Sequence, residues 1–363
     1  MKVAIIGAGL AGLACALTLE KEGVAFDIFE RRSMCGELFH HTSAMLQIMN
    51  RPVKDPLQHL SEQYDLNIAP ITPIKRIVMR TPLKESTVRG RNLGYFFMRG
   101  QQEGSIEQQL HGKLKTPVQF NTHADWRTLS EQYDYVVVCD GQGRITKELG
   151  CWNDTFRSWV KGATILGEFD QNTLIMWLNT NYCKSGYAYL TSYNKNKAFI
   201  ALVVPNCDQQ ELSYYWNLFL KLENIRFEVA ETFEVNHSAG HVFPHQVNNI
   251  LFAGLAGGFQ DPFLGFGQFA SLSTGAIAGR SISRQQDYET EIKAMTKEIR
   301  NLSDYRDNLD PITNPNYDLM VKALGFPGIN QAIYNTNLNV LKIGGAGMQV
   351  LTKLKKKLTH HTT

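Results

Sequence analysis

Short apolar runs that end in glycine or an acidic residue occur at three distant places in the chain, at residues 3–6, 135–139 and 249–253. Runs of this length, bounded by turn residues, are typical of buried strands. They are continuously apolar rather than alternating, which favours parallel strands covered on both faces. The pattern therefore predicts that these three segments are neighbours in one parallel sheet.

The first of these runs begins a β-α-β pattern. Residues 10–21 carry apolar side chains at helical spacing, and Gly23 follows as a helix-ending residue. Residues 24–29 form a second apolar run, which ends at Glu30. The opening of the chain thus predicts a strand, a helix and a parallel second strand.

The middle of the chain has a different hydrophobic pattern, made of short strands that follow one another closely. Residues 162–169, 173–178, 186–193 and 197–204 read as consecutive short strands, with turn residues such as Asn194-Lys195-Asn196 between the last two. This spacing predicts an antiparallel sheet. Asp208 is expected to cap a following helix, and the chain after Ser281 is expected to be mainly helical.

The turn between the first strand and the first helix reads Gly-Ala-Gly-Leu-Ala-Gly, from Gly7 to Gly12. In the G-x-G-x-x-G pattern the first glycine permits a tight turn, the second lets a pyrophosphate approach the backbone, and the third allows close helix–strand packing. Glu30 suits a free ribose diol and disfavours the 2′-phosphate of NADP. NAD and FAD both remain compatible with these residues.

Composition and charge exclude several classes. The net charge is 37 − 34 = +3, too close to balance for a nucleic-acid-binding protein. The six cysteines contain no C-x-x-C pair, and no metal site is expected. Their wide scatter argues against a disulfide framework, so a reducing, cytoplasmic setting is expected. We also expect no secretory signal and no membrane span. A Lys-rich C-terminal stretch, Lys353 to Lys357 interleaved with leucines, is compatible with peripheral contact to an anionic membrane.

Two later stretches distinguish FAD from NAD. Residues 133–144 resemble the second signature of FAD-binding proteins, and residues 251–279 resemble the third, with Gln260-Asp261-Pro262 and Gly265-Phe266-Gly267. Together with Cys35-Gly36-Glu37 and Gly186-Tyr187-Ala188-Tyr189, they resemble the geranylgeranyl reductase family within the aromatic-hydroxylase-type flavoproteins. The resemblance covers most of residues 1–285. It implies FAD bound across all three motifs.

The resemblance implies a set of cofactor-binding residues and one departure. Leu255 stands where the family has an acid that bonds the ribityl chain. Since a neutral hydrogen bond contributes about 1 kcal/mol, its loss should weaken FAD binding without abolishing it. The residues implied are Gly7, Ala8, Gly9, Leu10, Ala11, Gly12, Glu30, Arg31, Arg99, Asp140, Gly141, Gly254, Leu255, Gly265 and Gly267.

The predicted fold class is α/β. A Rossmann-like FAD-binding domain with a mainly parallel sheet is expected at residues 1–75, 95–155 and 245–285. It is interrupted by an α+β substrate domain with an antiparallel sheet, at residues 76–94 and 156–244. A helical region follows at residues 286–363. No dedicated nicotinamide domain is expected, so NAD(P)H or another reduced electron carrier would dock transiently.

The candidate catalytic residues are Cys35, as a proton donor near the flavin, and Tyr187 and Tyr189, which correspond to an aromatic segment lining the family's substrate tunnel. Trp177 and Tyr193 are expected to form the floor of an apolar pocket together with these tyrosines. His40 and His41 either lie near the flavin ring or begin an exposed helix.

The expected function is hydride transfer between FAD and an apolar substrate, with reduction of C=C bonds in an isoprenoid or similar lipid-like compound as the first hypothesis. The alternative is an FAD-dependent monooxygenase or oxidative tailoring enzyme that acts on an aromatic or cyclic molecule. A third hypothesis, suggested by Leu255, is a binding protein with a degenerate cofactor site. The oligomeric state is left open.

Overall fold

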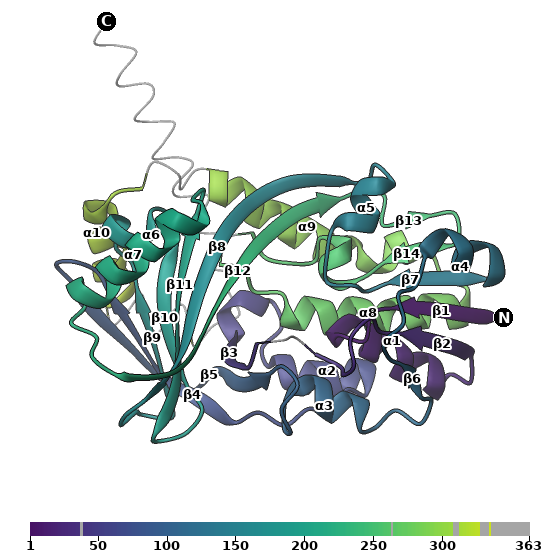
Figure 1. Ribbon diagram of the computed structural model, residues 1–363, viewed down its shortest axis with the longest axis horizontal. Helices are drawn as coiled ribbons and strands as arrows, with labels where there is room; N and C mark the ends of the chain where they lie inside the picture. Colours follow the sequence, from purple (N-terminus) through teal and green to yellow (C-terminus); the bar gives the residue numbers. More distant parts are fainter. Residues whose placement is uncertain (37–38, 263, 308–311, 327–333, 335–363) are drawn as a thin grey trace, which may run out of the picture.

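The computed structural model of the chain describes residues 1–36, 39–262, 264–307, 312–326 and 334. Within these residues the strands form two sheets (Figure 1). The smaller sheet has the order β13-β14-β7-β1-β2-β6 and is parallel except for the β13–β14 pair. Its strands are β1 (Lys2–Ile6), β2 (Ala25–Phe29), β6 (Val118–Gln119), β7 (Tyr135–Val138), β13 (Gln246–Val247) and β14 (Ile250–Phe252). The three apolar runs are therefore neighbours, as predicted.

The larger sheet has the order β12-β8-β11-β10-β9-β4-β5-β3 and is antiparallel except for the β4–β9 pair. It contains the four predicted consecutive strands. Figure 1 shows the long strands β8 and β12 running from this sheet toward α5 and β13. The strands are β3 (His41–Leu46), β4 (Thr72–Arg80), β5 (Glu85–Arg99), β8 (Trp152–Leu166), β9 (Thr173–Trp177), β10 (Tyr187–Ser192), β11 (Lys197–Pro205) and β12 (Glu228–Val242).

Several helices begin at a capping residue. Asp208 accepts a 2.8 Å hydrogen bond from the backbone N–H of Glu211, whose side chain accepts one from the backbone N–H of Asp208, so the predicted cap is confirmed. The helical segments are α1 (Leu10–Lys21), η1 (Gln47–Asn50), α2 (Pro56–Tyr64), α3 (Ile106–His111), α4 (Trp126–Gln132), α5 (Arg144–Glu148), α6 (Thr180–Cys183), α7 (Gln209–Leu222), η2 (Gly254–Gly257), α8 (Gln268–Arg284), α9 (Tyr288–Asp307) and α10 (Asn314–Leu324).

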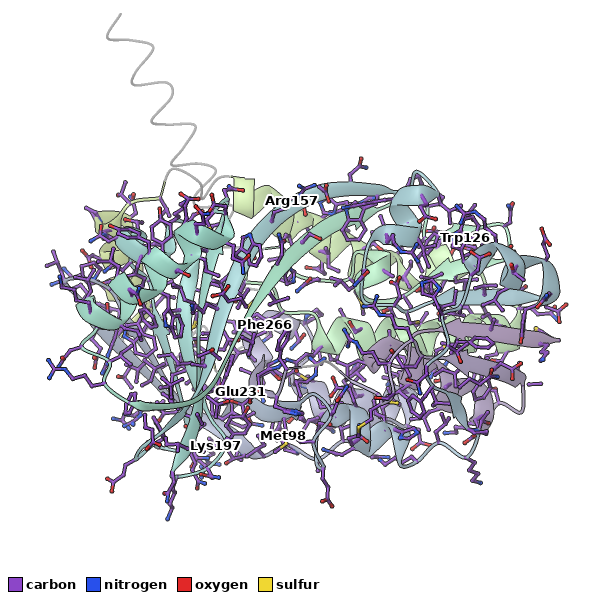
Figure 2. The ribbon with its side chains drawn as sticks, viewed as in Figure 1. Met98, Trp126, Arg157, Lys197, Glu231 and Phe266 are labelled. Atoms are coloured by element: carbon purple, nitrogen blue, oxygen red, sulfur yellow. The ribbon has the colours of Figure 1, made fainter. Side chains whose placement is uncertain are left out.

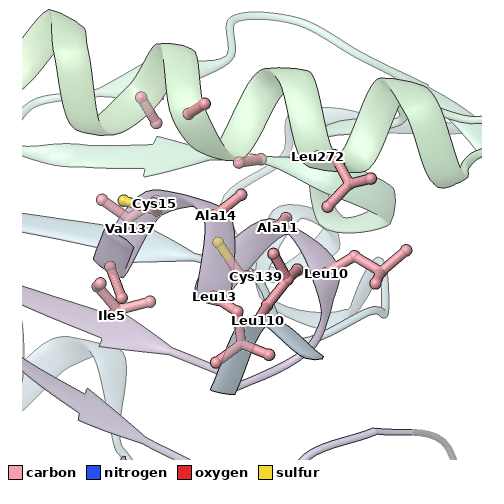
Figure 3. Packing of buried hydrophobic residues seen from close by; sticks show 14 of the residues in the cluster. Ile5, Leu10, Ala11, Leu13, Ala14, Cys15, Leu110, Val137, Cys139 and Leu272 are labelled. Carbon is pink, nitrogen blue, oxygen red and sulfur yellow. The ribbon is translucent and has the colours of Figure 1, made fainter. Parts of the chain in front are cut away.

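Helices α1 and α8 pack against each other at very short range (Figure 3). A Cβ atom on Gly275 would lie 2.0 Å from the carbonyl oxygen of Ala11, and one on Gly279 would lie 3.0 Å from that of Cys15. Glycine at these positions of α8 is therefore required by the close approach of the two helices. The contact holds Gly275, two turns into α8, against the first turn of α1.

The predicted fold class is confirmed: a mainly parallel Rossmann-like sheet, a second antiparallel sheet and C-terminal helices. Two segments that the predicted boundaries assign to the FAD-binding domain, β3 and the end of β5, pair within the larger sheet. The domain boundaries themselves remain a prediction. Glu37 and the Lys-rich stretch lie outside the described residues. Among the helices that are described, none has the length and apolar character needed to span a membrane.

Candidate functional site

The turn from Gly7 to Gly12 is shaped by its glycines. Gly7 has a φ of +100°, and a Cβ on it would lie 2.5 Å from the carbonyl oxygen of Cys139. A Cβ on Gly12 would lie 1.9 Å from the carbonyl oxygen of Gly7. Gly9 differs, because a Cβ there would have no atom within 4 Å. Gly7 and Gly12 are thus required by the fold, whereas Gly9 leaves open space beside the backbone.

The N-termini of α1 and α8 are not capped by side chains. Their N-cap residues are Gly9 and Gly267, and neither end has a side-chain hydrogen bond to its first turn. By contrast, α2, α3, α4 and α7 are capped, by Asp55, Ser105, Asp125 and Asp208 respectively. The first N–H groups of α1 and α8 can therefore donate hydrogen bonds to an anion or to a carbonyl oxygen of a ligand.

The three glycine-containing motifs meet at the carboxyl edge of the parallel sheet. Gly7 packs against the Cys139–Asp140 backbone, and a Cβ on Gly254 would lie 2.8 Å from that of Ala11. The N–H of Gly254 donates a 3.0 Å hydrogen bond to Oγ1 of Thr274 in α8. The ends of parallel strands at this edge are where doubly wound folds bind dinucleotides.

Glu30 lies at the end of β2, beside the first turn. Its Oε2 accepts a 2.9 Å hydrogen bond from the backbone N–H of Ala8, and its Oε1 accepts a 3.0 Å hydrogen bond from that of Arg32. These bonds hold the carboxylate next to the Gly7–Gly12 turn. Arg31 is exposed at the same edge.

Asp140 follows β7 and is partly buried; Gly141, in the left-handed region at φ +70°, comes next. Burial raises the pKa of Asp140 from 3.8 to about 6, although the backbone N–H of Gln142 and the charges of Arg144 and Arg31 act in the opposite direction. Burial disfavours the charged carboxylate.

This raised pKa predicts a pH dependence of stability. Between about pH 3.8 and pH 6 the folded protein binds a proton at Asp140 that the unfolded chain has lost, so its contribution to stability should fall as the pH rises through that window. Asp140→Asn should flatten this fall and raise the unfolding temperature at neutral pH. Unfolding temperatures of the unmodified protein and of Asp140→Asn, measured between about pH 3.8 and pH 6, test this prediction. If the two temperatures change in parallel with pH, Asp140 does not have the raised pKa.

The third motif forms a tight turn before α8, organised by Asp261. This buried carboxylate accepts a 2.9 Å hydrogen bond from the N–H of Leu264, and the N–H of Asp261 donates one of 2.8 Å to the carbonyl of Phe266. Gly265, with a φ of +75°, donates its N–H to the Asp261 carbonyl. Leu255 is partly buried in η2. The Asp-Pro pair in the motif was the available signal for this turn, but Asp261 is not among the predicted site residues.

Two glutamine side chains flank the open end of α8. The carbonyl oxygens of Gln260 and Gln268 are buried and have no hydrogen-bond partner within the described part of the chain. The Gln260 Nε2 donates a 2.7 Å hydrogen bond to the carbonyl of Gly265. The N–H donors at the N-terminus of α8 and the acceptor oxygens of Gln260 and Gln268 thus lie near one another. Sequence reasoning missed both side chains as site residues.

Cys35 and Arg99 lie together beside α3. Arg99 donates a 2.8 Å hydrogen bond from Nε to Oε1 of Glu107, and both side chains are at least nine-tenths buried. Burial, reinforced by the charges of Glu30 and Glu107, raises the pKa of the Cys35 thiol to about 12, so it stays protonated at neutral pH. Cys35 therefore lies close enough to Glu30 and Glu107 for their charges to act on its thiol.

Tyr187 and Tyr189 lie next to the third motif. The Tyr187 hydroxyl donates a hydrogen bond to the carbonyl of Leu264, and both rings pack in one cluster with Phe266. Phe266 is labelled in Figure 2. The expectation that Trp177 lies beside them is wrong. Trp177 pairs with Ala188, so it points to the opposite face of the sheet, where it packs on Phe219 at 5.4 Å.

The tyrosines begin a continuous line of contacting aromatic rings, here called the aromatic row, on the face of the larger sheet that is opposite to Trp177. Successive ring centroids are 5.9, 5.9, 5.6 and 4.5 Å apart. Gly162 makes room for it, because a Cβ there would lie within 2.8 Å of two of the rings. His41 begins β3 rather than a helix and lies 5.6 Å from one ring. The members, in order, are Tyr187, Tyr189, Phe199, Phe233 and Phe39.

Residues 5–51 match the family model of an NAD(P)-binding Rossmann-like domain. The whole chain is similar to a geranylgeranyl bacteriochlorophyll reductase-like protein from Thermoplasma acidophilum, with a TM-score of 0.72 and 13% identity over 96% of this chain and 98% of that one. A flavin-dependent brominase matches with a TM-score of 0.66 and 12% identity, over 98% and 100% of the two chains.

A third similar structure is 2-methyl-3-hydroxypyridine-5-carboxylic acid oxygenase, with a TM-score of 0.58 and 13% identity over 93% of this chain and 95% of that one. The chain therefore has the fold shared by these proteins, which include a reductase-like protein, a halogenating enzyme and an oxygenase. The resemblance expected from the sequence is confirmed at the level of the fold.

Proposed function

We propose that this chain is an FAD-dependent oxidoreductase that binds FAD extended across its three motifs. The observation that carries the proposal is the convergence of two uncapped helix N-termini at one edge of the parallel sheet. The open space at Gly9 suits a pyrophosphate against the first turn of α1. Glu30, held 2.9 Å from the N–H of Ala8, suits the adenosine ribose.

The residues around the N-terminus of α8 suit the flavin ring. The pyrimidine part of the ring carries carbonyl acceptors on either side of an N–H donor. The uncapped helix end supplies donors, and the carbonyl oxygens of Gln260 and Gln268 supply acceptors that have no partner of their own among the described residues. Leu255 offers no hydrogen bond, which at about 1 kcal/mol is a small part of the 8 to 12 kcal/mol of micromolar to nanomolar binding.

We further propose an apolar substrate, of the isoprenoid or lipid-like kind, whose C=C bond is reduced. Bound FAD supplies hydride transfer at the ring. The aromatic row binds an apolar chain along its face of the sheet and excludes water from it. Tyr187, whose hydroxyl donates a hydrogen bond to the Leu264 carbonyl, positions this surface against the third motif. The Tyr189 hydroxyl donates a proton to the substrate. NAD(P)H or another reduced carrier serves as the transient electron donor.

The direct test is anaerobic incubation of the chemically reduced FAD-loaded protein with geranylgeranyl diphosphate. Mass spectrometry should detect products that have gained one pair of hydrogens per reduced bond. Oxygen consumption stimulated by an aromatic compound, with no saturated isoprenoid, would instead support the oxygenase alternative. The similarity to an oxygenase over most of both chains favours that as the second candidate.

Truncating the aromatic row should weaken substrate binding more than catalysis. For Tyr189→Ala we expect KM for the apolar substrate to rise about tenfold, since a partly buried aromatic side chain contributes about 1.5 kcal/mol or more to such a contact. Leu190→Ala is the matched control, because Leu190 is the next residue and faces the other side of the strand. Steady-state kinetics on both variants measures the effect. Equal changes in KM would contradict the assignment.

A further inference from the structure

His245 is a buried histidine that contacts both the third motif and a helix outside all three motifs. It lies immediately before β13, and its side chain is only 3% exposed. Its Nδ1 lies 3.1 Å from Oε2 of Glu289, in the first turn of α9. Its ring lies against the ring of Phe259, with centroids 5.0 Å apart and planes inclined by 28°. The imidazole therefore links α9 to the third motif.

Glu289 fixes the orientation of this imidazole. Its Oε1 accepts hydrogen bonds from the backbone N–H groups of His245 and Gln246, and its Oε2 faces Nδ1 of His245. Because a carboxylate can only accept, the proton of the neutral ring is assigned to Nδ1. Burial, together with the charge of Arg300, lowers the pKa of His245 against the opposing effect of Glu289, so the ring is neutral at pH 7.

Phe259 connects this histidine to the residues that are proposed to hold the flavin. Its side chain is buried, and a Cβ on Gly257 would lie 2.7 Å from its ring, so the ring packs directly on that backbone. A Cβ on Gly267, the N-cap of α8, would lie 3.4 Å from the carbonyl oxygen of Phe259 and 3.3 Å from Cγ of Gln260. A shift of Phe259 would therefore displace the residues that pack against the uncapped end of α8.

A second hydrogen bond attaches α9 to the parallel sheet without using this ring contact. Tyr288 is fully buried, and its hydroxyl donates a 2.9 Å hydrogen bond to the carbonyl of Phe252, at the end of β14. Removing this hydroxyl weakens the attachment of α9 but leaves the rings of His245 and Phe259 in place. Tyr288 therefore supplies a matched control.

We propose that His245 is a positioning residue for the flavin, oriented by Glu289 and acting through the contact of its ring with Phe259. The inference rests on the proposed function, since it concerns FAD bound at the N-terminus of α8. It adds α9, which lies outside the three motifs, to the elements that set the position of the cofactor. His245 acts through Phe259 and not by contact with FAD.

The test separates the ring of His245 from its hydrogen bond. In His245→Asn the side-chain amide replaces the Nδ1–H donor to Glu289, but the ring is lost. We expect the Kd for FAD to rise about tenfold in this variant, which is the size of effect that one pair of aromatic rings can support. His245→Phe keeps a ring against Phe259 and should rescue most of this loss, to within about threefold of the unmodified protein. Calorimetric titration of FAD into the full-length apoproteins measures both.

The same contact is tested from the side of Phe259. Phe259→Leu should also raise the Kd about tenfold, and adding His245→Asn to it should change the Kd by less than a further factor of about two, because the contact is already lost. Tyr288→Phe should lower the unfolding temperature of the apoprotein but keep the Kd within about twofold. At saturating FAD, the visible circular dichroism of the bound flavin should change in His245→Asn and Phe259→Leu and stay unchanged in Tyr288→Phe.

Three results would overturn the inference: His245→Asn binds FAD as the unmodified protein does, the effects of His245→Asn and Phe259→Leu multiply in the double variant, or Tyr288→Phe raises the Kd as much as His245→Asn. If His245→Asn does not fold, Phe259→Leu decides, and an unchanged Kd there is equally contrary. An unmodified protein that binds no FAD would refute the proposed function together with this inference, so the two failures can be told apart.

Discussion

Replacing Gly9 with valine should abolish tight FAD binding and leave the fold intact. Gly9 has an extended backbone, with φ −87° and ψ −166°, that any residue can adopt, and a Cβ there meets no atom within 4 Å. The valine side chain would therefore occupy only the space proposed for the pyrophosphate. We expect a rise in the Kd for FAD of at least about a hundredfold, equivalent to about 2.7 kcal/mol.

Ala25→Val is the matched control for this variant. Ala25 is exposed in β2, within the same β-α-β unit, and the substitution adds apolar volume outside the site. Calorimetric titration of FAD into both apoproteins, with unfolding temperatures recorded alongside, measures the difference. If Gly9→Val binds FAD as Ala25→Val does, the pyrophosphate does not lie at this turn.

Gly275→Ala should destabilise the protein, although helix propensity alone predicts the opposite. Alanine in place of glycine inside a helix normally contributes about 0.5 to 1 kcal/mol of stability. Here the new Cβ would lie 2.0 Å from the carbonyl oxygen of Ala11, so α1 and α8 must separate. Overpacking of this kind costs about 1 to 3 kcal/mol or more, and the net result should be a loss of about 2 kcal/mol.

Gly279→Ala provides the graded comparison for this effect. Its Cβ would lie 3.0 Å from the carbonyl oxygen of Cys15, so a smaller shift of the helices relieves the contact. Urea unfolding of the two apoproteins should therefore rank Gly275→Ala as clearly the less stable. Equal stability, or a gain in both, would show that the helices are not held together by this close packing.

Much of the fold follows from local patterns in the sequence. Continuous apolar runs marked the central strands of the parallel sheet, because both faces of those strands are buried. Asp208 marked the start of α7, because a capping residue acts on its own first turn. The first glycine turn could also be predicted, since Gly7 and Gly12 are required by the close approach of backbone atoms, whereas Gly9 leaves open space beside the turn.

The faces of the larger sheet were harder to predict. α6 separates β9 from β10, so the register between them depends on tertiary packing. Trp177 pairs with Ala188 rather than with Tyr189, and a difference of one residue moves a side chain to the other face. The aromatic row depends on β12 pairing with β8, far away in the chain, so Phe233 carried no local signal of its role.

The most direct test of the account is the cofactor content of the purified protein. The protein is denatured, and the released small molecules are separated and identified by mass spectrometry. The account predicts FAD, near one molecule per chain after incubation with excess FAD and gel filtration. A chain that retains no flavin after this treatment, or that retains NAD in its place, would contradict the claim that the three motifs enclose FAD.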